Sequence, residues 1–169
     1  MILILMRHGI AEDGEPDADR ALTQDGRDRA SSIVRLLSRF QLAPHLLFSS
    51  PRKRALQTAE IIPDLLNQRA EIAITDALDF DGSLRALLSE IRNRRVKVED
   101  PVVIAVGHQP LLGQMAMEAL TGDASDLKVH KAACLGIRFP TDDPVPGRGE
   151  LYCYFGHGLA KGYAEGTKL

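Results

Sequence analysis

An α/β fold is predicted by the sequence, with a three-layer α/β/α architecture in which helices cover both faces of a mixed, mostly parallel sheet. Short apolar runs alternate with longer segments whose apolar residues recur every three or four positions, which is the pattern of βαβ units. Two runs, at residues 2–6 and 102–106, are apolar throughout, as expected for central strands covered on both faces. The length of 169 residues fits one substantial core, so we expect residues 1–169 to form a single domain.

The first half of the chain supplies two pairs of strand and helix. After the first strand, the apolar stripe in residues 30–40 marks a helix that begins with Thr23 as its N-cap. A strand at 46–48 is followed by Ser49-Ser50-Pro51, which predicts a helix with a capping hydroxyl and a proline at its first position. Pro63 is expected to end or kink that helix.

The second half continues the alternation and closes with a hairpin. The expected elements are, in order, an edge strand at 71–75, a helix over 84–91, the strand at 102–106, a helix through Ala119 with Gly122 as its C-cap, and a hairpin of residues 132–139 and 150–155. The tail from about residue 157 contains several glycines, and we expect it to be poorly ordered.

The composition is that of an ordinary globular protein, and it argues against two classes of partner. Hydrophobic residues make up 44% and charged residues 26%, with a net charge of -2. Nucleic acids and membrane surfaces usually select a strongly basic face, so we predict neither as a partner and expect any positive site to be local. No apolar run approaches the ~20 residues that cross a bilayer, and the apolar start is too short for a signal peptide. A cytoplasmic location is therefore expected.

The two cysteines, Cys134 and Cys153, are too few for a structural zinc site. We expect them to be small core side chains. They lie in the two segments of the predicted hairpin, so a disulfide between them is geometrically possible.

Histidines follow both fully apolar strands. His8 comes after the strand at 2–6 and His108 after the strand at 102–106, and each is next to a glycine. In open α/β sheets, ligands bind beyond the carboxyl ends of the strands. Two histidines at equivalent strand ends indicate a catalytic site more strongly than either would alone.

Four short motifs give the sequence a resemblance to a known family. They are Arg7-His8-Gly9, Leu22-Thr23 with Gly26, the segment Ser50-Pro51-x-x-Arg54-Ala55-x-x-Thr58-Ala59, and Gly107-His108. In this order, each at a strand end or a helix start, they resemble the histidine phosphatase superfamily, also called the phosphoglycerate mutase-like fold. Within it, the chain is most similar to the small phosphohistidine phosphatases of the SixA type.

The resemblance implies that His8 is a nucleophile that becomes phosphorylated, and that Arg7, Arg54 and His108 bind the transferred phosphate. The chemistry agrees with these residue types. Phosphoryl transfer spreads negative charge over three equatorial oxygens, and the planar fork of arginine binds two such oxygens at once. Neutral imidazole, the form that attacks, is available at pH 7, so neither a metal nor a cofactor is required.

Three further residues are candidates for the rim of the site. Arg20 resembles an arginine that often precedes the Leu-Thr motif in the family. It has two interpretations, a residue that lines the mouth of the pocket and a solvated charge of the loop. Asp79 and Asp81 are candidate proton donors for the leaving group. Arg52 and Lys53 are interpreted as surface charges that attract an acidic partner.

The substrate prediction depends on the proton donor. An alkoxide leaves badly without an acid, whereas phosphohistidine protonated on its distal ring nitrogen departs as neutral imidazole. Neither candidate acid lies in a convincing motif, and the segments 10–22 and 76–83 are too short to cap the pocket. We therefore favour phosphohistidine in a protein such as a histidine phosphotransfer domain. The alternatives are a phosphatase for small phosphate monoesters and a phosphate-binding module without turnover.

Overall fold

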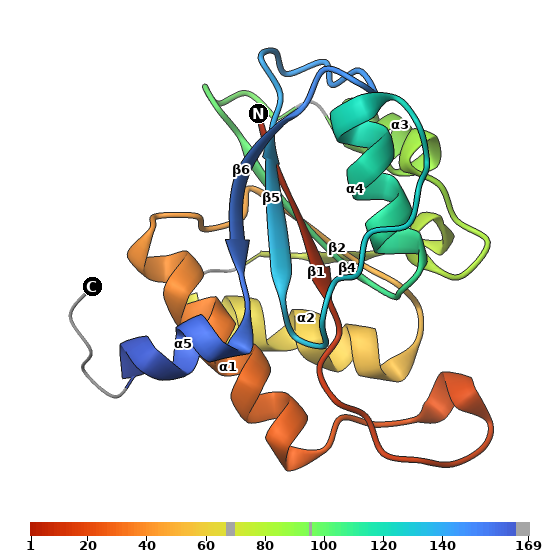
Figure 1. Cartoon of the computed structure of the whole chain (residues 1–169), viewed down its shortest axis with the longest axis vertical. Coiled ribbons are helices and arrows are strands. Elements are labelled where there is room, and N and C mark those ends of the chain that lie inside the picture. The colour runs from red at the N-terminus through yellow and green to blue at the C-terminus, as the bar shows by residue number, and fades with distance from the viewer. Residues whose placement is uncertain (67–69, 95, 165–169) are drawn as a thin grey trace.

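The computed structural model describes residues 1–66, 70–94 and 96–164, and its six strands form one sheet in the order β3-β2-β4-β1-β5-β6 (Figure 1). The strands are β1 (Ile2–Arg7), β2 (Leu46–Ser49), β3 (Ile72–Ile74), β4 (Val102–Gly107), β5 (Cys134–Arg138) and β6 (Glu150–Phe155). The first four are parallel to one another, and β5 and β6 are antiparallel to their neighbours. The predicted mixed, mostly parallel sheet is confirmed.

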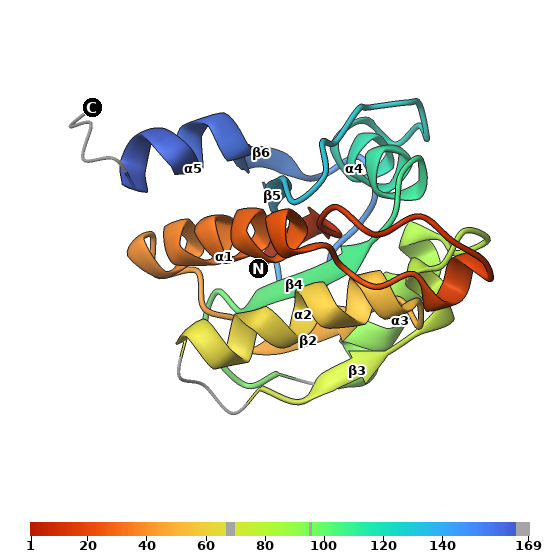
Figure 2. The ribbon, with the colours of Figure 1, turned by 90° about the horizontal axis from the view of Figure 1, so that it is seen from below.

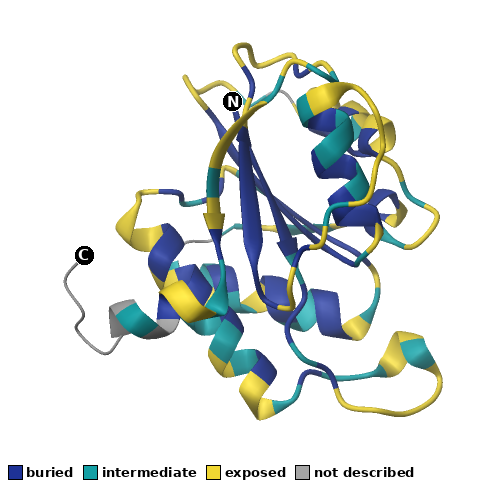
Figure 3. Cartoon of the chain, viewed as in Figure 1, coloured by how far each residue is buried: buried dark blue, intermediate teal, exposed yellow. Residues whose placement is uncertain are grey.

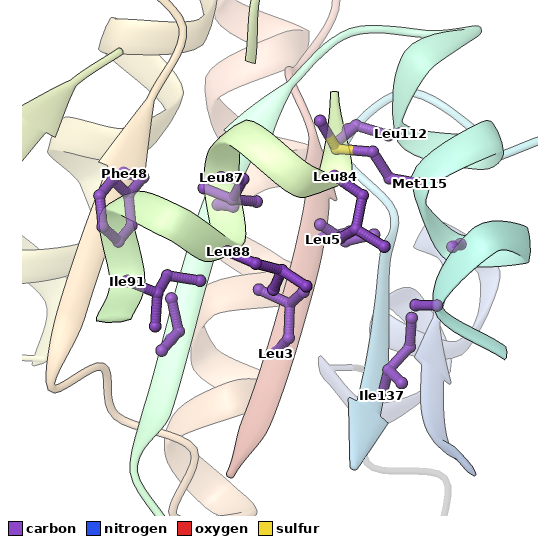
Figure 4. Packing of buried hydrophobic residues seen from close by; sticks show 14 of the residues in the cluster. Leu3, Leu5, Phe48, Leu84, Leu87, Leu88, Ile91, Leu112, Met115 and Ile137 are labelled. Atoms are coloured by element: carbon purple, nitrogen blue, oxygen red, sulfur yellow. The ribbon is translucent and has the colours of Figure 1, made fainter. Parts of the chain in front are cut away.

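Helices cover both faces of this sheet (Figure 2). Apolar residues of α1 (Gln24–Arg39), α2 (Lys53–Leu66) and α5 (His157–Ala164) form one core with Ile2, Ile4 and Met6 of β1. Those of α3 (Leu84–Asn93) and α4 (Leu111–Thr121) pack on the opposite face against Leu3 and Leu5 (Figure 4). Successive side chains of a strand point to opposite faces, so this alternation in β1 separates the two cores.

The central strand β4 is buried along its whole length, and β1 is buried except at its last residue, Arg7 (Figure 3). In the pairing of β1 with β4, Ile2 lies opposite Val102 and Arg7 lies opposite Gly107. The next residue of each strand is a histidine, so this register brings His8 and His108 out of the sheet side by side.

The predicted start of α2 is wrong by two residues. The helix begins at Lys53, and Pro51 lies in the bend before it. The Ser50 amide still donates to the carbonyl of Val106, so the chain remains tied to β4 up to that point. The amide of Arg52 donates to the Ser50 hydroxyl at 3.3 Å, which is therefore a cap of the bend and not of the first helical turn.

Pro63 does not end α2, which continues to Leu66. Pro63 has no amide proton to donate to the carbonyl of Ala59, so the helix continues past it with one backbone hydrogen bond fewer.

The tail that we expect to be poorly ordered begins at about residue 157, and the structure places residues 157–164 of it in α5. Ala160 is buried against the core on the α1 side of the sheet, and the ring of Phe155 stacks on that of Phe40 at a centroid distance of 5.1 Å. Apolar contacts thus hold the segment in spite of its glycines. The remaining tail, residues 165–169, lies outside the described residues.

The other predicted elements are confirmed within a few residues. Thr23 caps α1 by accepting a hydrogen bond from the Gly26 amide at 2.9 Å. Gly122 ends α4 with a φ of 89°, a left-handed conformation that glycine adopts without strain. Cys134 and Cys153 are free thiols on neighbouring strands. Among the described helices, none is both long and apolar enough to span a membrane.

Candidate active site

The imidazole of His8 is oriented by the backbone that follows it. Its Nδ1 atom lies 2.6 Å from the carbonyl oxygen of Gly9. A carbonyl only accepts hydrogen bonds, so Nδ1 carries the proton and Nε2 holds the free lone pair.

Arg54, in the first turn of α2, contacts that lone pair. Its Nε donates to Nε2 of His8 at 3.3 Å. Its Nη1 donates to the backbone carbonyl of Asp17 at 2.6 Å, and its Nη2 donates to a carboxylate oxygen of the same residue at 2.9 Å. The guanidinium is buried, and Asp17, on a short 3-10 helix at Asp17–Asp19, fixes its plane. An oxyanion bound at His8 would therefore meet a donor that is already positioned.

His108 stands opposite His8 and is almost completely buried. The two ring centroids are 5.0 Å apart, with 54° between the ring planes. The Nε2 atom of His108 lies 2.8 Å from the hydroxyl oxygen of Ser50. Sequence reasoning assigned Ser50 only to the helix start, and the signal it missed is that Ser50, like the two histidines, directly follows a strand.

Arg7 supplies a positive charge that no carboxylate balances in the described structure. Its Nη1 donates to the carbonyl of Val129 at 2.9 Å, and its buried Nε finds no partner among the described residues. The Arg7 charge also acts on His8, whose pKa it helps to lower. Arg7 is thus held beside His8 by the segment that precedes β5.

The remaining motif residues form the frame of the site. A Cβ atom on Gly26 would lie 2.1 Å from the Ile10 carbonyl oxygen, and one on Gly9 would lie 2.6 Å from the Gly26 carbonyl oxygen. Only glycines allow α1 to approach the loop after β1 so closely. The Thr58 hydroxyl accepts from the Gly9 amide at 3.1 Å and donates to the Arg54 carbonyl at 2.7 Å, which joins that loop to α2.

Both histidines are held in the neutral form. Burial is the largest cause, and it lowers the pKa of His8 from 6.5 to about 3 and that of His108 from 6.5 to about 4. The hydrogen bond to Gly9 acts in the opposite direction on His8, while the positive charge of Arg54 lowers the pKa of both rings. A neutral His8 is the form that can attack phosphorus.

These lowered pKa values predict a loss of stability in mild acid. The unfolded chain, in which each histidine titrates near 6.5, binds more protons than the folded chain between that pH and the folded pKa values of about 3 and 4. The free energy of unfolding should therefore fall as the pH drops from 6.5 to 4, by at most about 1.4 kcal/mol per pH unit for each ring. Urea unfolding in phosphate-free buffers measures this slope.

The His8→Asn variant is the control for that slope, because it removes one of the two rings and leaves His108. We expect the variant to lose stability about half as steeply as the wild type over the same pH window. Equal slopes in the two proteins would show that His8 is not held neutral by the fold.

Arg52 belongs to the rim of the site, so its interpretation as a free surface charge is wrong. Its Nη1 donates to Asp17 at 2.7 Å and its Nε donates to Asp79 at 2.5 Å. Its guanidinium carbon lies 4.0 Å from the centre of the Phe80 ring, and that ring is 5.1 Å from the ring of His108. Arg52 thus joins the loops 10–22 and 76–83, a convergence that sequence spacing does not reveal. Lys53 is exposed, as predicted.

Arg20 reaches the site only through Asp17. Its Nη1 donates to the Asp17 carboxylate at 3.0 Å, its Nε donates to the Glu12 carbonyl at 2.6 Å, and its Nη2 lies 3.4 Å from the Asp13 carboxylate. Burial alone would raise the pKa of Asp17, but hydrogen bonds from Arg54 and Arg20 outweigh it and lower this pKa to about 2. Arg20 therefore supports the carboxylate that positions Arg54.

The structure separates the two candidate proton donors. Asp79 lies at the rim, where burial raises its pKa but the hydrogen bond and charge of Arg52 lower it more, and its pKa is below the ordinary value. Asp81 is exposed, and the described residues give its side chain no polar partner. The Asp79 carboxyl group is therefore not held in the protonated form that a general acid needs.

A neutral imidazole with a free lone pair, surrounded by Arg7, Arg54 and His108, can attack phosphorus and hold the charge that develops on its oxygens. Among residues 1–66, 70–94 and 96–164, no cluster of histidine, cysteine and carboxylate side chains could hold a metal ion. With the fold, this arrangement defines the class of the protein as a phosphatase with histidine-based catalysis.

The chain belongs to the histidine phosphatase superfamily. The model of branch 1 of that superfamily matches residues 3–79. An uncharacterised protein of Picosynechococcus sp. is 34% identical over 146 residues, which cover 82% of this chain and 85% of that protein. Phosphohistidine phosphatase SixA of Escherichia coli is 29% identical over 127 residues, or 73% of this chain and 76% of that protein.

Solved structures confirm the phosphoglycerate mutase-like fold. The structure of the protein histidine phosphatase SixA complexed with tungstate matches with a TM-score of 0.80 and 23% identity, covering 94% of this chain and 98% of that chain. A putative SixA from Nakamurella multipartitia matches with a TM-score of 0.73 and 21% identity, covering 92% and 95% of the two chains.

Proposed function

We propose that this protein is a metal-independent phosphohistidine phosphatase of the cytoplasm, which hydrolyses phosphohistidine in a signalling or phosphotransfer protein through a phosphorylated His8. The observation that carries the proposal is the state of the carboxylates at the site. Asp17 and Asp79 are both ion-paired with arginines and have lowered pKa values, so both are ionised at neutral pH. A site without a protonated acid favours a leaving group that carries its own proton.

The first half of the reaction transfers the phosphoryl group to the enzyme. When the substrate binds, the Nε–H of Arg54 would donate its hydrogen bond to a phosphoryl oxygen and no longer to His8 Nε2. The lone pair on Nε2 is then free. His8 Nε2 then attacks phosphorus as the P–N bond of the substrate breaks. The leaving imidazole, already protonated on its distal nitrogen, departs neutral. Arg7, Arg54 and His108 hold the three equatorial oxygens during the transfer.

The second half returns the enzyme to its starting state. A water molecule attacks phosphorus in line with the His8 Nε2–P bond, which breaks to leave phosphate and neutral His8. The water proton leaves with the phosphate product. The Nδ1–H of His8 stays bonded to the Gly9 carbonyl in both halves, so the ring keeps its orientation and tautomer throughout.

The comparisons support the same proposal. Relatives named phosphohistidine phosphatase cover most of this chain, and one SixA structure with this fold contains tungstate, a tetrahedral oxyanion like phosphate. We propose that such an oxyanion binds here between His8 and the two arginines.

The proposal is tested by comparing a phosphorylated histidine phosphotransfer domain with p-nitrophenyl phosphate as substrates, both in the presence of EDTA. We expect efficient turnover of the phosphoprotein with EDTA present. Asp79→Asn should change that turnover by less than about threefold, whereas loss of a true general acid costs about a hundredfold or more.

Asp81→Asn is the matched control, because it removes a carboxylate from the same loop that does not touch Arg52. If Asp79→Asn lowered turnover of the ester about a hundredfold while Asp81→Asn did not, Asp79 would be the general acid and the small-ester function would replace our proposal. Turnover that stops in EDTA would contradict metal independence.

A further inference from the structure

We propose that a pocket adjoining Arg7 binds a second anionic group of the substrate, a carboxylate or a phosphate carried on the same molecule as the phosphoryl group. This inference rests on the proposed function, because Arg7 would bind the phosphoryl group at the same time. The pocket has a volume of about 460 Å³, and its lining includes residues of α1, the end of β6 and the start of α5. Figure 1 shows that these three elements lie close together. Its basic lining residues are Arg7, Arg29, His130, Lys131 and His157.

The lining is positively charged although the chain as a whole carries a net charge of -2. Arg7 and Lys131 form no ion pair within the described structure. Arg29 is paired with Asp25 at 2.9 Å, and this carboxylate balances one charge without lining the pocket. Two cations are thus left for a ligand. A local excess of positive charge in a hollow attracts anions more strongly than the same charges on a flat surface.

His157 also lines the pocket. His157 is also the first residue of α5, whose amide groups face its amino end.

The basic segment is fixed to the catalytic loop by its backbone. The Arg7 amide donates to the carbonyl of Ala133 at 2.9 Å, and the amide of Ala132 donates to the carbonyl of His8 at 3.1 Å. Ala132 is fully buried and has a φ of 61°, the left-handed conformation that residues other than glycine rarely adopt. Such strain persists where the surrounding structure enforces it, often at functional sites. Here it holds Lys131 next to the loop that carries the nucleophile.

Arg7 therefore connects two sites. On one side its charge acts on His8, and on the other its side chain lines the basic pocket. A substrate with its phosphoryl group on His8 could place a second anionic group beyond Arg7, within reach of Lys131. In a phosphoprotein this group would be an acidic side chain near the phosphohistidine, and in a small molecule it would be a second phosphate or a carboxylate.

The test measures binding and does not require turnover. The test uses a series of peptides that contain a hydrolysis-resistant phosphonate analogue of phosphohistidine. Each peptide carries one glutamate, at a different position between three residues before and three residues after the analogue. Each is compared with its glutamine counterpart by calorimetry. We expect the glutamate peptide to bind about tenfold more tightly at one position or more, as a charge-assisted hydrogen bond allows. To test whether the second anionic group belongs to a small molecule, the binding of a propanediol bisphosphate is compared with that of propanediol monophosphate.

Three variants identify the pocket as the cause. Lys131→Gln should reduce the preference to less than about twofold, whereas Lys131→Arg should retain it, since it keeps the charge. Lys128→Gln is the matched control, because Lys128 is an exposed lysine of the same loop that does not line the pocket. A preference in the peptides supports a protein substrate, and a preference in the bisphosphate alone supports a small one.

The inference is overturned if neither set shows a preference above twofold, or if Lys131→Gln keeps the preference intact. Failure of the proposed function is a separate result. If the wild type bound the glutamate peptides preferentially but did not turn over phosphohistidine, the pocket would stand and the proposed reaction would fall.

Discussion

Replacing His8 by asparagine is expected to abolish phosphoenzyme formation and to lower turnover at least about ten thousandfold, as loss of a nucleophile does in other covalent mechanisms. Asparagine offers an amide near the position of Nδ1 and can keep a hydrogen bond to Gly9, but it has no nucleophile at the position of Nε2. The measurement uses a labelled phosphohistidine protein. The reaction is stopped in alkaline detergent, since acid hydrolyses the P–N bond, and the labelled residue is identified by mass spectrometry.

The wild type should carry the label on His8, and His8→Asn should carry none. Thermal unfolding at pH 8, where His8 and His108 of the wild type are neutral, checks that the variant is folded. Label on another residue in the variant would identify a different nucleophile. A wild type that binds the phosphoprotein but never becomes labelled would instead be a phosphate-binding module.

Replacing Arg54 by lysine is expected to lower kcat/KM by about a thousandfold or more, although the charge is kept, because arginines that stabilise transferring phosphoryl groups contribute factors of about that size. Arg54 uses three nitrogens in three directions, toward His8 Nε2, the Asp17 carbonyl and the Asp17 carboxylate. A single ammonium group cannot make this fork. The lysine ammonium group of the variant would pair with the Asp17 carboxylate, and the transferring phosphoryl group would lose the hydrogen bond that Arg54 donates.

Lys53→Gln is the control for Arg54→Lys, because it removes a neighbouring exposed positive charge from the same helix start. Its turnover should match the wild type if position, and not overall charge, is what matters. Guanidinium ion added to an Arg54→Ala variant should restore part of the lost activity. Equal losses in Lys53→Gln and Arg54→Lys would instead indicate that α2 acts only through its net charge.

Much of this site could be predicted because its residues sit at strand ends. A fully apolar run of five residues is typical of a central strand in an α/β arrangement, and the residue that follows it emerges at the carboxyl edge of the sheet. That is why His8 and His108 could be paired without coordinates. The helix that carries Arg54 was also predictable, but its first residue was not. The Ser-Pro pattern does not reveal that the Ser50 amide still donates to β4, which delays the start of the helix.

The errors came from contacts between segments that are distant in the sequence. Arg52 looks like any exposed lysine or arginine until Asp17 and Asp79 converge on it from two separate loops. The glycines of the tail predict a poorly ordered segment, and the burial of Ala160 in the same core as α1 is a tertiary contact that this glycine pattern does not reveal.

The sequence by itself determined the fold class, the two strands whose ends carry the site, and the types of residue needed for phosphoryl transfer, because periodicity and short-range motifs encode these properties. Only the tertiary structure decided which nitrogen of His8 is free, which carboxylates are neutralised, and that Arg7 lies between two basic regions. Those properties depend on distances between atoms from separate segments, and the energies of hydrogen bonds and of buried charges change steeply with such distances.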